Sequence, residues 1–260
     1  MRYIASLILF TTLISSHSFA QNESALDIAL RVDQADSGWK DQEVNATMTL
    51  YAANGRSVTR ALRSLSLESN EGDRSLVIFD QPRDVKGTVF LTHTYKQGND
   101  DQWLFLPAIK RIKRISSSNR SGPFMGSEFA YEDISSEEIE RYTYDGLQAS
   151  QCSNDNNESI DCYIYNRYPV DKSSGYTKQI VSVDKSHYRI LNIDYYDRKD
   201  SHQKTLTREQ YQKFGNYWRA SRWLMVNHLN NKKTTVEWDG GQFASGLSPR
   251  EFEKAALKNY

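Results

Sequence analysis

The chain has 260 residues, of which 38% are hydrophobic, 12% are aromatic and 25% are charged. This length suffices for one well-buried domain or for two small ones, and all-β domains of this size are often single. Lysine plus arginine and aspartate plus glutamate each total 33, so the formal net charge is zero. A neutral chain argues against binding to nucleic acid through long-range attraction, and its charged groups are expected to act locally.

The first twenty residues are predicted to be a signal peptide that is cleaved near Ala20. Arg2 provides a short basic start, an apolar run extends over residues 4–14, and Ser18 and Ala20 are the small residues before the cleavage point. The apolar run is shorter than the roughly 20 residues that span a membrane. No cysteine follows that could carry a lipid anchor, so we expect an exported, soluble protein with a single domain over residues 21–260.

Helices are predicted near both ends of the chain. The first covers residues 24–36, where Ser24 begins a capping-box pattern and Leu26 and Leu30 contribute to an apolar face. The second is predicted at the end of the chain, because residues 248–251 form a capping box with proline at the first helical position.

Between the two helices the hydrophobic pattern has a period of two. In residues 43–51, Val44, Met48 and Leu50 alternate with polar residues, which is typical of a half-buried strand. Similar segments rich in tyrosine, threonine, valine and isoleucine follow, and predict roughly ten or eleven antiparallel strands. Because a flat sheet of that length exposes its edges, we expect a curled sheet in a mainly β fold with a few helices (α+β). Two short helices on its concave side would cover a lined cavity.

Cys152 and Cys162 are the two cysteines of the chain and flank a polar loop between two strand-like runs. In an exported protein such a pair is expected to form a disulfide, which here would pin a hairpin loop and stabilise the fold by about 2–3 kcal/mol. A metal or redox site would require further ligands or a C-x-x-C spacing, and the sequence has neither.

The sequence contains little that supports catalysis. The four histidines after the signal peptide are scattered, and there is no H-E-x-x-H metal motif, no G-x-S-x-G nucleophile motif and no glycine-rich phosphate loop. Two carboxylate pairs, at residues 132–133 and 137–138, are predicted to lie on a solvated loop or helix start. We therefore expect no catalytic residues, no cofactor and no metal.

Residues 101–133 place a dense apolar cluster directly before a basic one. In the strand predicted over residues 101–107, Trp103 and Phe105 point to one face and leucines to the other, so core or ligand should cover both faces. The basic run that follows has two interpretations. It is either a solvated edge strand, on which lysine discourages aggregation, or a rim that contacts anionic headgroups or an acidic partner surface. The run consists of Lys110, Arg111, Lys113 and Arg114, and Arg120 would extend it.

Residues 116–129 are predicted to form a mobile loop. Phe124 and Met125 lie between glycines with no periodic strand around them, and Phe129 follows shortly after. An apolar pair on such a loop can cap a cavity or insert into it, and methionine adapts to variable apolar ligands. The alternative is a loop that one phenylalanine anchors in the core.

These motifs resemble those of a known family. W-L-F-L-P at residues 103–107, the basic run, and G-P-F-M-G-S-E-F-A-Y-E-D at residues 122–133 are similar to the periplasmic outer-membrane lipoprotein-sorting-like proteins of the LolA/LolB superfamily. Q-P-R-D-V-K-G-T-V-F-L at residues 81–91 fits the same pattern. The resemblance implies an unclosed β-barrel in which helices form a lid over an apolar cavity that takes acyl chains. It also implies a Gram-negative periplasm and, as a candidate partner, an inner-membrane transporter of the resistance-nodulation-division (RND) type.

The residues and the resemblance together predict a periplasmic carrier, expected to be monomeric, that holds a lipid or lipoprotein acyl chain and passes it between membranes or to a transporter. Each buried CH₂ group contributes about 0.8 kcal/mol, so an apolar cavity can bind a long chain without specific contacts. Two alternatives are a non-enzymatic accessory subunit of an RND-type transporter and, with the weakest support, a lipid hydrolase. The basic run is expected at the headgroup or the partner. The residues expected at the acyl chain are Trp103, Phe105, Phe124, Met125 and Phe129.

Overall fold

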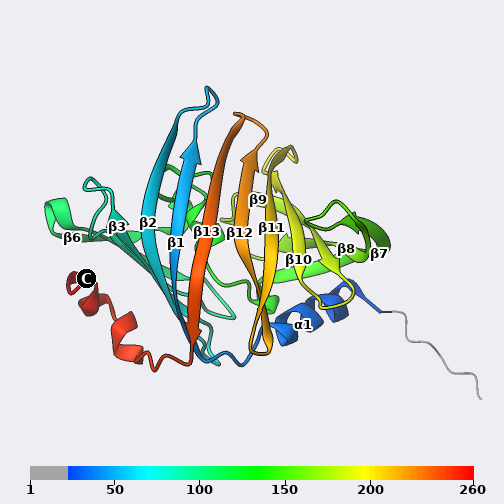
Figure 1. Ribbon diagram of the computed structural model, residues 1–260, viewed down its shortest axis with the longest axis horizontal. Coiled ribbons are helices and arrows are strands. Elements are labelled where there is room, and N and C mark those ends of the chain that lie inside the picture. The colour runs from blue at the N-terminus through cyan, green and yellow to red at the C-terminus, as the bar shows by residue number, and fades with distance from the viewer. Residues whose placement is uncertain (1–22) are drawn as a thin grey trace, which may run out of the picture.

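The computed structural model describes residues 23–260, so the predicted signal peptide lies outside the described residues. Within that range, one α-helix, thirteen β-strands and seven short 3₁₀ helices make up the fold (Figure 1). The helix is α1 (Ala25–Ala35), and the strands are β1 (Asp41–Tyr51), β2 (Ser57–Leu67), β3 (Arg74–Gln81), β4 (Val89–His93), β5 (Asp101–Leu106), β6 (Arg111–Ile115), β7 (Tyr142–Ser153), β8 (Ser159–Pro169), β9 (Tyr176–Asp184), β10 (Ile190–Asp197), β11 (His202–Phe214), β12 (Tyr217–Asn227) and β13 (Lys232–Phe243). The 3₁₀ helices are η1 (Pro107–Ile109), η2 (Ser117–Asn119), η3 (Phe124–Gly126), η4 (Tyr131–Ile134), η5 (Ile139–Arg141), η6 (Pro249–Phe252) and η7 (Lys254–Lys258).

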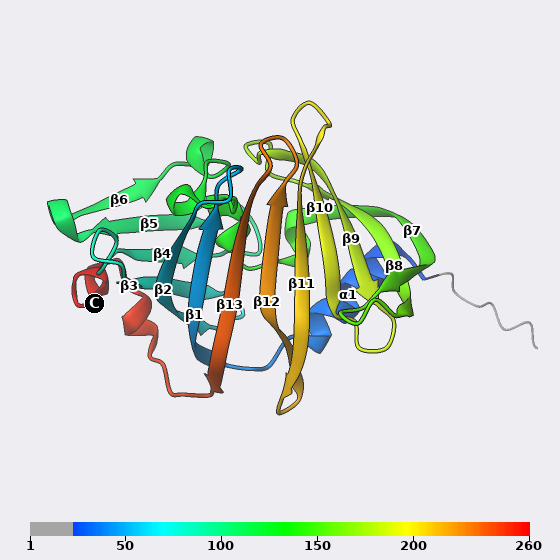
Figure 2. The same ribbon diagram turned by 45° about the horizontal axis from the view of Figure 1, so that its top comes forward.

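All thirteen strands belong to one antiparallel sheet, whose order is β6-β5-β4-β3-β2-β1-β13-β12-β11-β10-β9-β8-β7. Two meanders, β1–β6 and β7–β13, are joined by pairing between the first and last strands, where Met48 lies opposite Val236. The sheet curls across its width (Figures 1 and 2), but in the described chain β6 and β7 each pair with a single strand and remain its edges. The prediction of an unclosed, mainly β fold is therefore confirmed, with thirteen strands in place of ten or eleven.

The connection from β6 to β7 has to cross the molecule, because these strands are the opposite edges of the sheet. We call residues 116–141 the crossing segment. It runs over the concave face, where Phe124 packs on phenylalanine rings of β3 and β4 at centroid distances of 5.9 and 5.1 Å. Further along, the backbone N–H of Glu128 donates to Oγ1 of Thr234 in β13 at 3.0 Å. The loop predicted to be mobile is thus a packed segment, and the alternative of a loop anchored by one phenylalanine describes it better.

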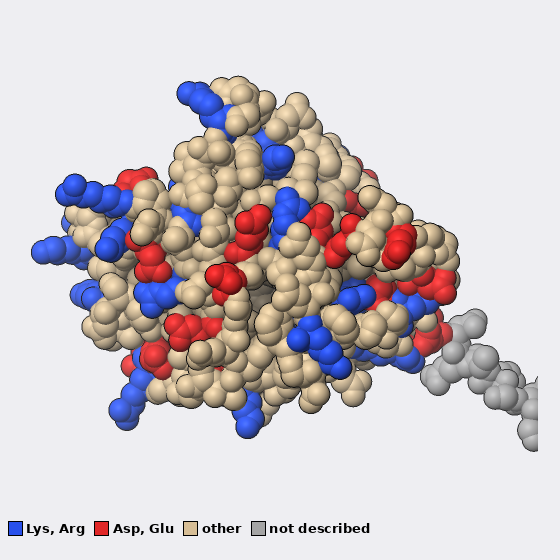
Figure 3. Space-filling view, in the orientation of Figure 1, with Lys and Arg blue, Asp and Glu red and all other residues tan. Residues whose placement is uncertain are grey.

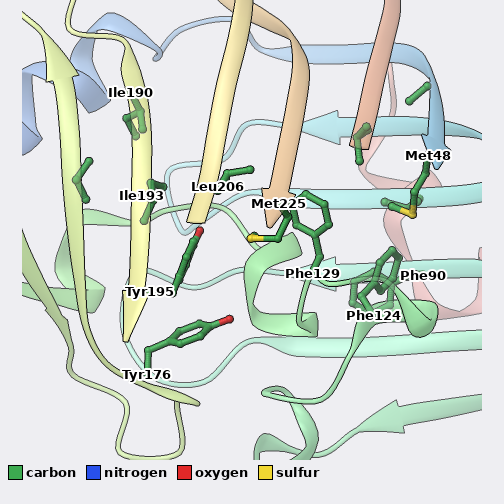
Figure 4. Packing of buried hydrophobic residues seen from close by; sticks show 14 of the residues in the cluster. Met48, Phe90, Phe124, Phe129, Tyr176, Ile190, Ile193, Tyr195, Leu206 and Met225 are labelled. Carbon is green, nitrogen blue, oxygen red and sulfur yellow. The ribbon is translucent and has the colours of Figure 1, made fainter. Parts of the chain in front are cut away.

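Alternation along the strands sends side chains to two separate clusters. On β3, Val77 and Phe79 point to the concave face and join the main cluster, whereas Leu76 and Ile78 point to the outer face and join a smaller one. Because both faces of β3 and β4 are covered, their sequences are almost continuously apolar. Residues of the concave cluster labelled in Figure 4 are Met48, Phe90, Phe124, Phe129, Tyr176, Ile190, Ile193, Tyr195, Leu206 and Met225.

Helix α1 lies at one side of the concave face and packs against β7 and β8 (Figures 1 and 2). Its predicted cap is present, since the backbone N–H of Asp27 donates to Oγ of Ser24 at 3.1 Å. The buried side of the helix centres on Ile28, whereas Leu26 and Leu30 are 43% and 47% exposed. The predicted apolar face is therefore partly wrong. Neither α1 nor any other helix in residues 23–260 is long and apolar enough to cross a membrane.

The prediction of a second α-helix at the end of the chain is wrong. A capping box forms between Ser248 and Glu251 as expected, but the helical turns η6 and η7 are separated by Glu253, whose backbone is extended with a ψ of 144°. Phe252 and Leu257 are fully buried in the outer cluster. The end of the chain thus covers the outer face of β3, β4 and β5, and α1 is the α-helix of the described chain on the concave side.

The predicted disulfide is present and links Cys152 of β7 to Cys162 of β8, with Cα atoms 5.8 Å apart. These strands form a hairpin at one end of the sheet, and within the described chain β7 has no partner on its other side. The disulfide therefore closes the hairpin that carries a free edge.

Candidate functional site

A cavity of about 1000 Å³ lies between the concave face of the sheet, α1 and the crossing segment. Small-molecule sites in proteins have volumes of about 300–1,000 Å³, so this cavity can accept a large ligand. The strands contribute most of its walls, and the crossing segment contributes the part that faces them. Apolar residues of the lining include Val32 of α1, Val44 and Met48 of β1, Val77 of β3, and Phe124 and Phe129 of the crossing segment.

One wall of the cavity is aromatic. The ring of Trp223 on β12 lies 5.3 Å from the ring of Trp238 on β13 and 6.5 Å from the ring of Phe129, measured between centroids. Trp223 is also paired across the strands with Val236, which in turn is paired with Met48, and all of these residues line the cavity. The result is a continuous apolar surface over three neighbouring strands. The sequence reasoning did not single out the two tryptophans, because their alternation shows a one-sided strand but not which side faces the cavity.

The crossing segment is fixed by the buried rings of Phe124 and Phe129 and by hydrogen bonds. Phe124 has no exposed surface, and its backbone N–H donates to the carbonyl oxygen of Phe129 at 2.7 Å. The hydroxyl of Ser127 donates to the carbonyl oxygen of Phe124 at 2.7 Å. Met125 has a φ of 50°, and its carbonyl oxygen accepts a hydrogen bond from Nη1 of Arg60 at 2.6 Å. Arg60, which the sequence reasoning did not identify, thus ties this segment to β2.

The five residues predicted at the acyl chain do not lie together. Phe124 and Phe129 line the cavity, whereas Met125 packs against the concave cluster without lining it. Trp103 and Phe105 belong to the outer cluster, on the opposite face of the sheet. Alternation on β5 is the reason, because the leucine between them is the residue that points inward. A ligand in the cavity would be near Phe124 and Phe129 but separated from Trp103 and Phe105 by the sheet.

The basic run forms the edge strand β6 and the residue before it. We call Lys110, Arg111, Lys113 and Arg114 the basic edge; all four are exposed, and none lines the cavity. Arg114 pairs with Asp101 at 2.5 Å, whereas the other three form no ion pair with residues 23–260. Figure 3 shows lysine and arginine side chains projecting at the left, where Figure 1 places β6. The basic edge is therefore available for contacts outside the molecule but is not part of the cavity.

Other charged residues that were predicted to be solvated are internal. Arg120 is 4% exposed and bridges Asp100 and Asp171, at 3.1 and 3.0 Å, so it does not extend the basic edge. Asp133 accepts a hydrogen bond from Nζ of Lys204 at 2.6 Å. The predictions for these residues were wrong because their partners are distant in the sequence, and only the folded sheet brings them into contact.

Glu137 is another such residue, and it lies on the wall of the cavity. Its carboxylate accepts hydrogen bonds from Nη1 of Arg167 on β8, at 2.6 Å, and from Nη2 of Arg208 on β11. Burial alone would raise the pKa of Glu137, but the two guanidinium groups outweigh burial and lower the pKa to about 2. The cavity wall therefore carries an ionised carboxylate between two arginines.

A second group of carboxylates lines the cavity nearer to the start of β3. Burial, together with the nearby carboxylates of Glu138 and Glu68, raises the pKa of Asp73 to about 7, although hydrogen bonds to Ser69 and Ser136 act to lower it. Burial also raises the pKa of Asp33 on α1 and of Glu138. No group of histidine, cysteine, aspartate and glutamate side chains in the described part of the chain is arranged to hold a metal ion. The charge in this part of the cavity is therefore expected to change near neutral pH.

Comparison with known proteins identifies similar chains of the same architecture. Residues 71–259 match a family model that carries the description "-like: Uncharacterized protein". A solved structure from Vibrio parahaemolyticus, whose description names an outer membrane lipoprotein-sorting protein domain, is 47% identical, with 90% of this chain and 98% of that chain covered and a TM-score of 0.85. A DUF1329 family protein from Desulfovibrio piger is 32% identical, with 90% and 97% covered and a TM-score of 0.83.

A third solved structure extends the similarity in fold. A LolA superfamily protein from Nitrosomonas europaea is 19% identical, with 90% of this chain and 99% of that chain covered and a TM-score of 0.72. At that identity the similarity concerns the fold alone. A separate comparison with curated proteins found no match.

Proposed function

The chain belongs to the outer-membrane lipoprotein-sorting-like family, and on that basis we propose that it is a carrier for an acyl chain. In this proposal the cavity holds the hydrocarbon part of a lipid or lipoprotein and releases it unchanged to a membrane or to a partner. The observation that carries the proposal is the cavity of about 1000 Å³ with its aromatic wall.

The energetics of such binding are favourable without specific contacts. Each CH₂ group that leaves water contributes about 0.8 kcal/mol, so ten buried groups contribute about 8 kcal/mol before the entropy of association is subtracted. Planar rings such as those of Trp223, Trp238 and Phe129 offer a large contact area to a hydrocarbon chain. A carrier also has to release its cargo, and an affinity that depends on apolar area alone can be lost when the cavity opens.

Helix α1 is the element that we propose to move when cargo enters. Nη1 of Arg31 donates to the hydroxyl of Tyr188 at 2.7 Å, and Asp36, just after the helix, forms an ion pair with Arg219. Exposed polar contacts of this kind are weak. On its inner side the helix is held by Ala25, Ile28 and Ala29, which are buried in the concave cluster, so opening has to expose these three side chains. The crossing segment is held by the buried rings of Phe124 and Phe129, and we propose that it stays in place.

The proposed location is the periplasm. The predicted signal peptide and the disulfide between Cys152 and Cys162 both support export to an oxidising compartment. We further propose that the basic edge contacts anionic headgroups of a membrane or an acidic surface of a partner, such as an inner-membrane RND-type transporter. Its separation from the cavity supports a docking role over direct contact with the cargo.

The proposal is tested by purifying the mature protein without detergent, followed by native mass spectrometry and extraction of any bound lipid. The protein is then stripped and titrated with a fluorescent fatty acid. A stoichiometric intact lipid and saturable uptake of the probe would support a carrier. An empty protein that takes up no probe would instead favour the accessory-subunit function, and release of free fatty acid from a bound ester would favour a hydrolase.

Two variants place the binding site. Ser64 on β2 lines the cavity, and replacing it by tryptophan should fill part of the space and weaken binding of the probe. Thr47 on β1 is exposed on the outer face, so Thr47→Trp adds the same side chain outside the cavity and should leave binding unchanged. Equal binding by both variants would place the ligand elsewhere.

A further inference from the structure

One arginine on the cavity wall lacks a full set of partners. Arg167 and Arg208 share the single carboxylate of Glu137, so this group of three side chains carries one excess positive charge. The other carboxylate that acts on Arg208, Asp36, is itself paired with Arg219. A positive charge away from bulk water is costly unless it is paired. A negative group from outside the chain would complete this site.

The hydrogen bonds show which of the two arginines is incomplete. Nε of Arg167 donates to Oε1 of Gln179 at 2.7 Å, and its Nη1 donates to Glu137 at 2.6 Å. For Arg208, Glu137 is the single acceptor among residues 23–260, and the Nε atom is buried without a partner. A guanidinium group has five N–H donors, so Arg208 retains donors for a further acceptor.

A second donor without a partner lies on the same wall. Nε1 of Trp238 is buried and has no hydrogen-bond partner in the described chain, and both Trp238 and Arg208 line the cavity. Trp223 is close to both, since its ring centre is 4.9 Å from the guanidinium carbon of Arg208 and 5.3 Å from the ring centre of Trp238. Buried donors without acceptors are rare in native proteins, and a ligand is one way to satisfy them.

We propose that the cargo is an anionic amphiphile, with its acyl chain against the aromatic wall and a carboxylate or phosphate at Arg208 and Trp238. This inference rests on the proposed carrier function and names the chemical class of the cargo. The planar fork of an arginine matches the oxygens of both anions, and an indole N–H adds one more donor. A neutral headgroup would leave the excess charge of Arg208 uncompensated. The cavity therefore selects its cargo by the charge of the headgroup as well as by the acyl chain.

The test compares ligands that share one chain and differ in the headgroup. The stripped mature protein is loaded with a neutral fluorescent acyl ester, which is then displaced by laurate, dodecyl phosphate or dodecanol. We expect laurate and dodecyl phosphate to displace the probe at about tenfold lower concentration than dodecanol, the effect of one charge-assisted hydrogen bond. The stronger of the two anions distinguishes a fatty acid from a phosphorylated lipid as the source of the headgroup.

Variants assign the effect to the named donors. Arg208→Gln should remove the advantage of the anions while dodecanol binds as before, and Trp238→Phe should reduce it by a smaller factor. Arg63→Gln is the matched control, because Arg63 pairs with Asp80 at 2.9 Å and does not line the cavity. Thermal melting of each variant verifies that it is folded, and Arg208→Lys, which keeps the charge, should retain part of the advantage.

The outcomes separate this inference from the carrier function on which it rests. Equal displacement by laurate and dodecanol in the wild type, or an unchanged advantage in Arg208→Gln, would overturn the anionic cargo and leave the carrier standing. A stripped protein that binds neither the probe nor any of the three ligands would overturn both.

Discussion

Replacing Phe124 by alanine tests whether a single ring anchors the crossing segment. The ring has no exposed surface and lies 5.9, 5.1 and 5.5 Å from the rings of Phe79, Phe90 and Tyr131. Removing a buried phenylalanine side chain from a core costs about 3–5 kcal/mol. Since three aromatic contacts are lost together, we expect the free energy of unfolding to fall by about 4 kcal/mol.

The assay is thermal and denaturant unfolding of the mature protein. For a domain of this size, 1 kcal/mol shifts the Tm by about 2–4 °C, so Phe124→Ala should lower it by about 10 °C. The variant should also bind the fluorescent acyl probe more weakly, because Phe124 and Phe129 both line the cavity and are joined by a backbone hydrogen bond.

Met125→Ala is the matched control for this experiment. Met125 is the next residue of the same segment and is only half-buried, so its truncation should cost about 1 kcal/mol. If the two variants melted within about a degree of each other, the ring of Phe124 would not be the anchor. The crossing segment would then depend on its backbone hydrogen bonds and on Arg60.

Three further predictions concern the charged groups. Glu137→Gln should lower the free energy of unfolding by about 2–3 kcal/mol, because it leaves the charges of Arg167 and Arg208 without a carboxylate. The control is Glu138→Gln, which should not destabilise the protein because the pKa of the Glu138 carboxyl is raised. Equal losses in the two variants would contradict a stabilising role of the Glu137 ion pairs. The raised pKa of Asp73, about 7, means that the folded state holds the proton more tightly than the unfolded state, so stability should fall as the pH rises from about 4 to about 7. Asp73→Asn should remove most of that decline in a series of melting curves, and a profile parallel to the wild type would be evidence against it. Replacing the basic edge by serines should leave the Tm unchanged but weaken binding to vesicles that contain anionic lipid, by about 1 kcal/mol for each charge lost; undiminished binding in a sedimentation assay would assign the membrane contact to another surface.

The two proposals give the charged groups separate tasks. The basic edge lies on the rim of the sheet and is open to large anionic surfaces, whereas Arg208 lies inside the cavity and can reach only a group that enters it. The acidic residues near the start of β3, including Asp73 and Glu138, line another part of the same cavity.

The strands could be predicted from the sequence because their information is local. Polar and apolar residues alternate in residues 43–51 and in the later tyrosine- and valine-rich runs because a strand has two faces. This pattern can be read without knowledge of distant contacts. The cap at Ser24 and the disulfide between Cys152 and Cys162 depend on short-range chemistry, and both are present. The prediction of a second α-helix was wrong because the end of the chain depends on distant contacts. Phe252 and Leu257 pack on the outer face of the sheet, and this packing shapes η6 and η7.

The cavity could not be predicted in detail, because its walls are assembled from strands that meet only through the pairing of β1 with β13. A period of two shows that a strand has two faces but not which one is concave, and this placed Trp103 and Phe105 on the wrong side of the expected site. The partners of Glu137 lie on β8 and β11, which are distant in the sequence. Its carboxylate was therefore predicted to be solvated, whereas the curled sheet brings it against two arginines. The sequence by itself thus determined the first helix, most of the strands, the disulfide and the family resemblance. Only the tertiary structure decided which side chains share the cavity, since closeness across a curled sheet depends on register and curvature, which no local pattern encodes.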